Sequence, residues 1–267
     1  MLRKRWFRLI SILVLFTYSA DAQVKDTTSL SLQEIKNFNL DLKIARPAES
    51  KKITLKSFYV PAGLITYGIV SLESHDLTKL NYKVREEIYL ESPHKKLRVD
   101  DYLQYAPAVA VYGLNLAGIK GLNNFRDRSI IYLMSDIILN ASVSWGKKTS
   151  RQLRPDESNY LSFPSGHTAH AFASAEFLRR EYRHISPWYG YAGYAVAATT
   201  GYLRMYNNRH WLSDVAAGAG VGIASMRIAY WLYPKVKKIF FNKSKSDNII
   251  IPSYSDGSIG LNFVRQF

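Results

Sequence analysis

Residues 203–214 read LRMYNNRHWLSD, with an arginine at 204, a histidine six positions later and an aspartate four positions after that. A separation of four places two side chains on one face of a helical turn. Asp214 can therefore accept a hydrogen bond from one imidazole nitrogen of His210 and leave the other nitrogen as a nucleophile. The spacing predicts an oriented histidine beside the cation Arg204.

Two shorter segments precede this stretch. Residues 147–155 read KKTSRQLRP and supply Lys147 and Arg154, and residues 164–167 read PSGH. Guanidinium groups match the oxygens of a phosphate in a bidentate fork. Three cations brought together, with Arg204 as the third, indicate a site for a multiply charged anion.

The PSGH segment lies where a loop enters a predicted helix. Backbone N–H groups and the helix dipole at such a junction point towards an anion, and Gly166 lets the ligand approach the backbone. If His167 and His210 flank a phosphate, His167 can protonate the leaving oxygen and later activate water. The three segments together indicate phosphoryl transfer through a histidine.

In this order the segments resemble the type 2 phosphatidic acid phosphatase (PAP2) and vanadium haloperoxidase superfamily, whose pattern is KxxxxxxRP, PSGH and SRxxxxxHxxxD. Every charged or titratable position of that pattern is present, while Leu203 stands where the family usually has serine. We expect this departure to affect phosphate positioning slightly. The resemblance implies a six-helix bundle with His210 as nucleophile, Asp214 as its orienter and His167 as general acid. It also implies that phosphate is held by Lys147, Arg154, Ser165, Gly166 and Arg204.

Apolar periodicity predicts an all-α domain over residues 57–240. Its last helix is expected to end at Pro234. Asp136, Glu176 and Arg227 would be costly if they faced lipid, so the sequence leaves open whether the helices span a membrane. The six stretches that look helical are Tyr59 to Glu73, Tyr102 to Lys120, Arg126 to Trp145, Gly166 to Tyr182, Trp188 to Met205 and Asp214 to Tyr233.

The two ends of the chain differ from this domain. Residues 1–22 have a basic start, an apolar run and a small-residue cleavage pattern, which predicts an export signal rather than a retained anchor. Residues 23–56 are a polar, extended lead-in. Residues 241–267 are predicted to be a basic linker followed by a β-hairpin that packs against the helical domain or the lead-in. The terminal Phe267 on an amphipathic strand also makes an outer-membrane location possible.

The chain has 267 residues, a formal net charge of +15 and no cysteine. Without cysteine, neither thiol chemistry nor cysteine-ligated zinc is possible. Removal of the signal would leave +12, which favours anionic lipid headgroups, phosphorylated substrates or surface polysaccharide as partners rather than nucleic acid. His170 follows His167 by three positions, but no carboxylate accompanies the pair at motif spacing, so we expect no metal site there.

We therefore expect a metal-independent phosphatase that acts on a phosphomonoester or pyrophosphate, with a lipid as the leading substrate class and a small phosphate ester as the other. It would work on the periplasmic side of the cell envelope, associated with or integral to the inner membrane, and vanadate would inhibit it. One alternative is a haloperoxidase that uses vanadate as its cofactor. The other is an anion-binding envelope protein without catalysis. The intact set of His167, His210 and Asp214 argues against it, because a binding pocket needs cations but no oriented nucleophile.

Overall fold

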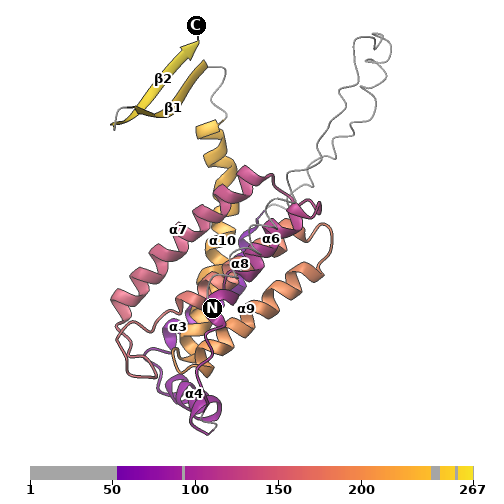
Figure 1. The fold of residues 1–267 in the computed structure, drawn as a ribbon. Helices are drawn as coiled ribbons and strands as arrows, with labels where there is room; N and C mark the ends of the chain where they lie inside the picture. The colour runs from indigo at the N-terminus through magenta and orange to yellow at the C-terminus, as the bar shows by residue number, and fades with distance from the viewer. Residues whose placement is uncertain (1–52, 92–93, 242–246, 256–257, 267) are drawn as a thin grey trace, which may run out of the picture. The chain divides into compact units, whose positions relative to one another are not determined.

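The structure, a computed structural model, describes residues 53–91, 94–241, 247–255 and 258–266. The predicted signal and most of the predicted lead-in lie outside these ranges. The all-α domain is confirmed, because each predicted helical stretch contains a helix (Figure 1). The helical elements are η1 Leu55–Phe58, α3 Tyr59–Val70, α4 His75–Arg85, η2 Glu86–Leu90, α5 Asp100–Leu103, α6 Ala106–Leu116, α7 Phe125–Ser150, α8 Gly166–Tyr182, α9 Trp188–Tyr206 and α10 Leu212–Phe241.

Helix starts follow the sequence signals. Asn124 caps α7 by accepting a hydrogen bond from the backbone N–H of Asp127 at 2.9 Å, and Ser165 caps α8. Side-chain oxygens at these positions satisfy backbone donors that have no partner within the helix. Pro107 falls in the first turn of α6, where its missing N–H costs nothing. The second predicted stretch is therefore divided: α5 ends at Leu103, and α6 begins at Ala106, next to the proline.

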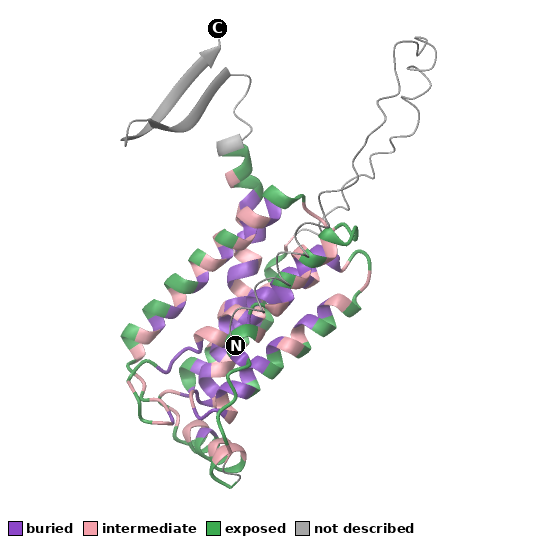
Figure 2. Ribbon diagram, in the orientation of Figure 1, coloured by how far each residue is buried: buried purple, intermediate pink, exposed green. Residues whose placement is uncertain are grey.

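Helices α8 and α10 form the centre of the domain. α8 packs against α6, α7, α9 and α10, and α10 packs in turn against α3 and α7. In Figure 2 the buried residues follow α8 along most of its length. The core cluster joins Ile131 and Leu139 of α7 to Phe177 of α8 and Met226 of α10.

The small residues of α10 allow this close packing. A Cβ added at Gly218 would lie 2.5 Å from the carbonyl oxygen of Ser165, and one at Gly220 would lie 2.6 Å from that of Pro61. At Gly222 a Cβ would overlap the carbonyl oxygen of Ala169. Because these neighbours are backbone atoms, no side-chain movement can make room for a methyl group.

A buried ionic cluster ties α8, α9 and α10 together. Glu176 accepts hydrogen bonds from Arg179, Arg180 and Arg227 at 2.6–3.0 Å and from Tyr194 at 2.5 Å. Burial alone would raise the pKa of Glu176, but the hydrogen bonds and charge of Arg179, followed by the Arg227 hydrogen bond, lower it to about 2. Glu176 and Arg227 therefore face each other inside the domain.

Two parts of the domain differ from the prediction. α10 continues through Pro234 to Phe241, because Tyr233 and Lys237 on either side of the proline bind Asp127 of α7 at 2.6 and 2.5 Å. These contacts offset the hydrogen bond that an internal proline removes. α4 was not predicted at all, and its mostly polar sequence explains why.

One described helix, α10, is long and apolar enough over Leu212–Ile239 to cross a membrane, and 56% of its most apolar window is buried inside the protein. A second candidate is the pair Leu55–Val70 and His75–Leu90, which is bent by 94°. A core helix of a soluble protein passes the same test. Beyond the helices, β1 (Asp247–Ser255) and β2 (Ser258–Gln266) pair antiparallel, from Asp247 opposite Gln266 to Ser255 opposite Ser258.

Candidate active site

Four helix ends meet at one cleft of about 410 Å³. The last turns of α7 and α9, the first turn of α8 and the loop before α10 each contribute to its wall. All three sequence motifs therefore reach the same place. The predicted site residues that line the cleft are Lys147, Arg154, Gly166, His167, Arg204 and His210.

His210 and Asp214 form a buried pair on the wall of this cleft. The Nδ1 atom of His210 lies 3.3 Å from Oδ2 of Asp214, and the two residues are 3% and 0% exposed. The same carboxylate oxygen accepts hydrogen bonds from the Trp211 backbone N–H at 2.9 Å and from the Ser162 hydroxyl at 2.5 Å. A carboxylate held in this way favours a proton on Nδ1, which leaves the Nε2 lone pair free.

The surroundings of His210 also favour its neutral form. Burial lowers the pKa of His210 well below its usual value, and the positive charges of Arg204 and Lys147 lower it further. A neutral imidazole retains the lone pair that a nucleophile needs. The imidazole of His210 is thus uncharged at neutral pH.

The three cations stand around the histidine with unused donors. Arg204 donates to Oδ2 of Asp100 at 2.5 Å, and Lys147 donates to the Leu161 carbonyl oxygen at 2.6 Å. The buried Nε atoms of Arg154 and Arg204 have no hydrogen-bond partner in the described part of the chain. Buried donors without partners are costly, so an oxyanion in the cleft would complete their hydrogen bonding.

Ser165 and Gly166 occupy different positions at the start of α8. The Ser165 hydroxyl is fully buried against Thr168, at 2.9 Å between the two oxygens, and the Ser165 backbone N–H donates to the Asp214 carbonyl at 3.0 Å. Gly166 lines the cleft, where an added Cβ would meet only Val143, at 3.6 Å. Packing therefore does not require a glycine at this position, and the open backbone faces the cleft.

Two acidic residues that sequence reasoning missed also line the cleft. Asp100 binds Arg204, and Oδ1 of Asp101 lies 2.9 Å from Nε2 of His167. Burial and the charge of Arg204 lower the pKa of His167, while Asp101 opposes that shift. Asp101 thereby favours the protonated imidazole, but the pKa of His167 stays below its usual value. No fixed spacing links these acids to the motifs, so the sequence carries no signal for them.

The rim of the cleft comes from two loops. Arg209 donates to Oδ2 of Asp156 at 2.9 Å, and Lys96 lies 3.8 Å from the same oxygen. Asp156 therefore pairs with both cations at the rim. His170 lies 3.4 Å from Asp136 and does not line the cleft.

Comparisons with known proteins agree with the motifs. Residues 130–238 match the PAP2 superfamily, so the resemblance seen in the sequence is confirmed. The lipid A 1-phosphatase of Porphyromonas gingivalis is 40% identical over 174 residues, which make up 65% of this chain and 37% of that protein. The chain thus spans well under half the length of this curated relative.

Two crystal structures are also similar. Aquifex aeolicus LpxE is 22% identical over 57% of this chain and 94% of its own, with a TM-score of 0.45. A transmembrane PAP2-type phosphatidylglycerolphosphate phosphatase from Bacillus subtilis is 16% identical over 67% of this chain and 98% of its own, with a TM-score of 0.44.

Proposed function

Residues 130–238 place this chain with the PAP2 superfamily, and on that premise we propose that it is a phosphatase that removes phosphate from a phosphorylated lipid. One observation carries the proposal. The buried His210, 3.3 Å from Asp214, opens onto a cleft that also holds Lys147, Arg154 and Arg204. An anion-binding pocket needs the cations, but it does not need an oriented and neutral histidine.

The proposed reaction has two steps. Nε2 of His210 attacks phosphorus, the bond from phosphorus to the leaving oxygen breaks, and His167 gives that oxygen a proton. His167 then takes a proton from water, whose oxygen attacks the phosphohistidine and releases inorganic phosphate and free His210. The positive charges of Lys147, Arg154 and Arg204 stabilise the negative charge that develops on the phosphoryl oxygens.

We propose that this chemistry needs no metal ion. The three cations supply the positive charge, and the unpartnered Nε atoms of Arg154 and Arg204 are donors suited to phosphoryl oxygens. Vanadate should inhibit the enzyme, because it adopts the five-coordinate geometry of phosphoryl transfer.

A lipid substrate is supported by the surface and by the relative. The lipid A 1-phosphatase makes lipid A the first candidate. Leu133 and Ile137 lie one helical turn apart on α7 and are 58% and 61% exposed, and Trp145 further along the helix is 71% exposed. Such apolar exposure on one helix suits contact with a bilayer. We propose that the protein works at the periplasmic face of the inner membrane.

Phosphate release by the purified full chain tests this function. The panel comprises lipid A, phosphatidate, phosphatidylglycerol phosphate, undecaprenyl pyrophosphate and nitrophenyl phosphate, each with and without a chelator. We expect release from at least one lipid, unchanged by chelation and blocked by vanadate. Loss of release on chelation, restored by a divalent metal, would overturn the metal-free mechanism. Halide oxidation dependent on added vanadate, without phosphate release, would replace the phosphatase with a haloperoxidase.

Replacing His167 should produce a loss that depends on the leaving group. His167→Ala is expected to slow hydrolysis of an alkyl phosphate by about 10²–10⁴-fold, and that of nitrophenyl phosphate much less, because a good leaving group needs little protonation. The measurement is kcat for both esters. His170→Ala, which alters a histidine on the same helix outside the cleft, is the control. Equal losses for the two esters would remove the general-acid role from His167.

The charge on Lys147 should set an alkaline limit to activity. Burial, followed by the charge of Arg154, lowers the pKa of Lys147 to about 8. Below that pH the ammonium group is charged and attracts the phosphate, and as pH rises through about 8 the charge is lost. We therefore expect kcat/KM to fall above this pH. Lys147→Arg should move the fall in kcat/KM to higher pH. If the pH profile of this variant were unchanged, the fall would come from another titrating group.

A further inference from the structure

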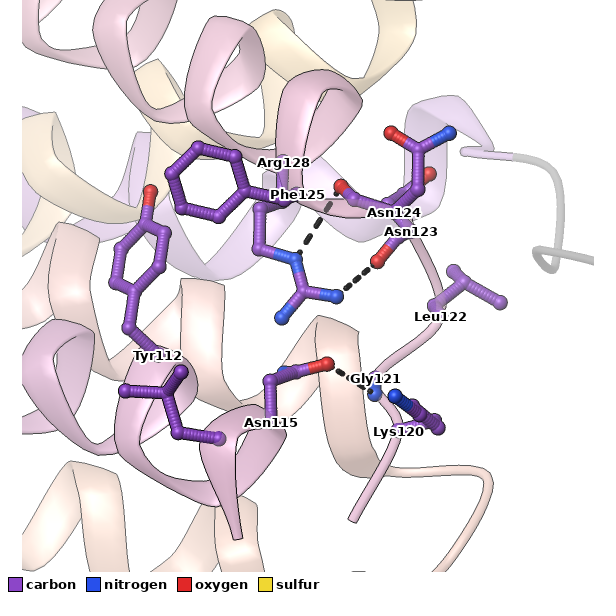
Figure 3. A pocket seen from close by; sticks show the side chains of 10 residues that line it. Tyr112, Asn115, Lys120, Gly121, Leu122, Asn123, Asn124, Phe125 and Arg128 are labelled. Carbon is purple, nitrogen blue, oxygen red and sulfur yellow. Dashed lines mark hydrogen bonds between the residues drawn. The ribbon is translucent and has the colours of Figure 1, made fainter. Parts of the chain in front are cut away.

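A second cavity, of about 470 Å³, lies between α6 and the first turn of α7. Figure 3 shows it lined by residues of α6, of the connection after it and of the start of α7. The catalytic cleft lies at the opposite end of α7, where Lys147 lines it. At 1.5 Å per residue, Arg128 and Lys147 are separated by about 28 Å along the helix. The cavity is therefore a site distinct from the catalytic cleft.

The cavity contains a buried cation whose hydrogen bonding is incomplete. Arg128 is 4% exposed, and its guanidinium group points into the cavity beside Tyr112 and Asn115 (Figure 3). Nε donates to the Asn124 carbonyl oxygen at 3.3 Å and Nη2 donates to that of Asn123. Nη1 is buried and has no hydrogen-bond partner in the described residues. Two carbonyl groups thus fix the guanidinium while one nitrogen remains for a ligand.

The protein does not fill this position with a carboxylate of its own. No acidic residue in the described part of the chain lines the cavity. Glu181 lies behind Gly121, but Asn123 and Tyr230 donate to its carboxylate. The Tyr182 hydroxyl accepts from Asn115 and shares its one proton between the carbonyl oxygens of Val111 and Ile119. Burial raises the pKa of Tyr182, and the charge and hydrogen bonding of Arg128 oppose that rise. A guanidinium group has five N–H donors, so this contact does not use up those of Arg128. An anionic ligand would supply the acceptor that Nη1 lacks.

The remaining walls are apolar. Leu116 and Phe125 line the cavity and are 91% and 72% exposed, and the exposed Lys120 adds a second positive charge near them. We propose that this cavity binds an amphiphile whose oxyanion headgroup, a phosphate or a carboxylate, pairs with Arg128 while its apolar chain lies against Leu116 and Phe125. This inference does not depend on the reaction proposed for the catalytic cleft.

Photocrosslinking to the full chain in neutral detergent tests the site without any turnover. The probe is a decyl phosphonate with a photoreactive group at the end of its chain, used with saturating inorganic phosphate to occupy the catalytic cleft. We expect labelled peptides from residues 112–128. Unlabelled decyl phosphonate and decanoate should compete, whereas a decyl glucoside should not, and labelling of residues 112–128 should be the same with and without the inorganic phosphate.

Variants then identify the cation. Arg128→Gln should reduce labelling of residues 112–128 by about tenfold, the usual effect of losing a charged hydrogen bond. Arg183→Gln, which removes the same charge outside the cavity, should leave labelling unchanged. If Arg128→Gln does not fold, the exposed Lys120→Gln should still reduce labelling by about threefold.

Four results would overturn the proposal. Labelling confined to peptides of the catalytic cleft would show that the cavity binds no amphiphile. Equal competition by decyl glucoside would show that binding needs no oxyanion, and labelling abolished by inorganic phosphate would show that the apolar chain does not contribute to binding. Undiminished labelling of a folded Arg128→Gln protein, or of Lys120→Gln where Arg128→Gln does not fold, would show that these cations do not hold the ligand.

Discussion

His210→Ala should lower kcat by about 10⁴-fold or more, the scale seen when a catalytic nucleophile is removed. The reason is the geometry of the cleft. Of the described histidines that line it, His210 is the one with a buried carboxylate at its Nδ1, which leaves Nε2 free to attack. The measurement is single-turnover phosphate release together with trapping of an acid-labile, alkali-stable phosphoenzyme. We expect the wild type to form this phosphoenzyme and the variant to lack it.

The control for this prediction separates chemistry from folding. His210 is 3% exposed, so its removal also leaves a small cavity, and His210→Gln should be measured alongside His210→Ala. His184→Ala changes an exposed histidine in the loop between α8 and α9 and should retain full turnover. A well-folded His210→Ala protein with near-normal release would contradict the phosphohistidine mechanism.

Gly222→Ala should destabilise the domain by about 1–3 kcal/mol, the usual cost of overpacking. A Cβ at Gly222 would overlap the Ala169 carbonyl oxygen and lie 2.9 Å from the Ala173 nitrogen, and both atoms belong to the backbone of α8. The two central helices would have to move apart, and α8 carries His167 at its start. Thermal unfolding should show a fall of about 2–4 °C per kcal/mol.

Gly113→Ala is the matched control for this substitution. Gly113 lies within α6, is exposed, and has nothing within 4 Å of an added Cβ. Alanine there should stabilise the protein by up to about 1 kcal/mol, because glycine loses more backbone entropy on folding. If both variants unfolded at the wild-type temperature, the close approach of α8 and α10 would not be the limiting contact in the core.

The sequence predicted the part of the cleft that its motifs encode. His210 and Asp214 pair as their spacing of four predicts, but not on one helical turn: His210 lies in the loop before α10, and Asp214 in the first turn of α10 contacts it. The six predicted helical stretches follow from apolar periodicity, whereas α4 does not. Leu203, the one departure from the family pattern, is 9% exposed, adjoins Arg204 in α9 and does not line the cleft.

The other residues of the cleft lie beyond the reach of local spacing. Asp100 meets Arg204 across 104 residues of chain, and Asn81 meets Ser213 across 132. These pairs exist only because α4 and α5 pack beside α9 and α10. α10 continues beyond Pro234, where the sequence predicted its end, because tertiary contacts with α7 and not local propensity hold its last turns.

The contact between Asn81 and Ser213 determines how much of the chain is needed to build the cleft. The Asn81 side chain donates to the Ser213 hydroxyl at 2.9 Å and accepts from the Ser213 backbone N–H at 3.1 Å, next to Asp214. The family match starts at residue 130 and contains every motif, yet it excludes this clamp and both acids of the cleft. A chimera that grafted only residues 130–238 onto another bundle would carry every motif. It would lack Asn81, which binds Ser213 next to Asp214, and Asp101, which contacts His167. The smallest transplantable unit therefore has to start upstream of Asn81.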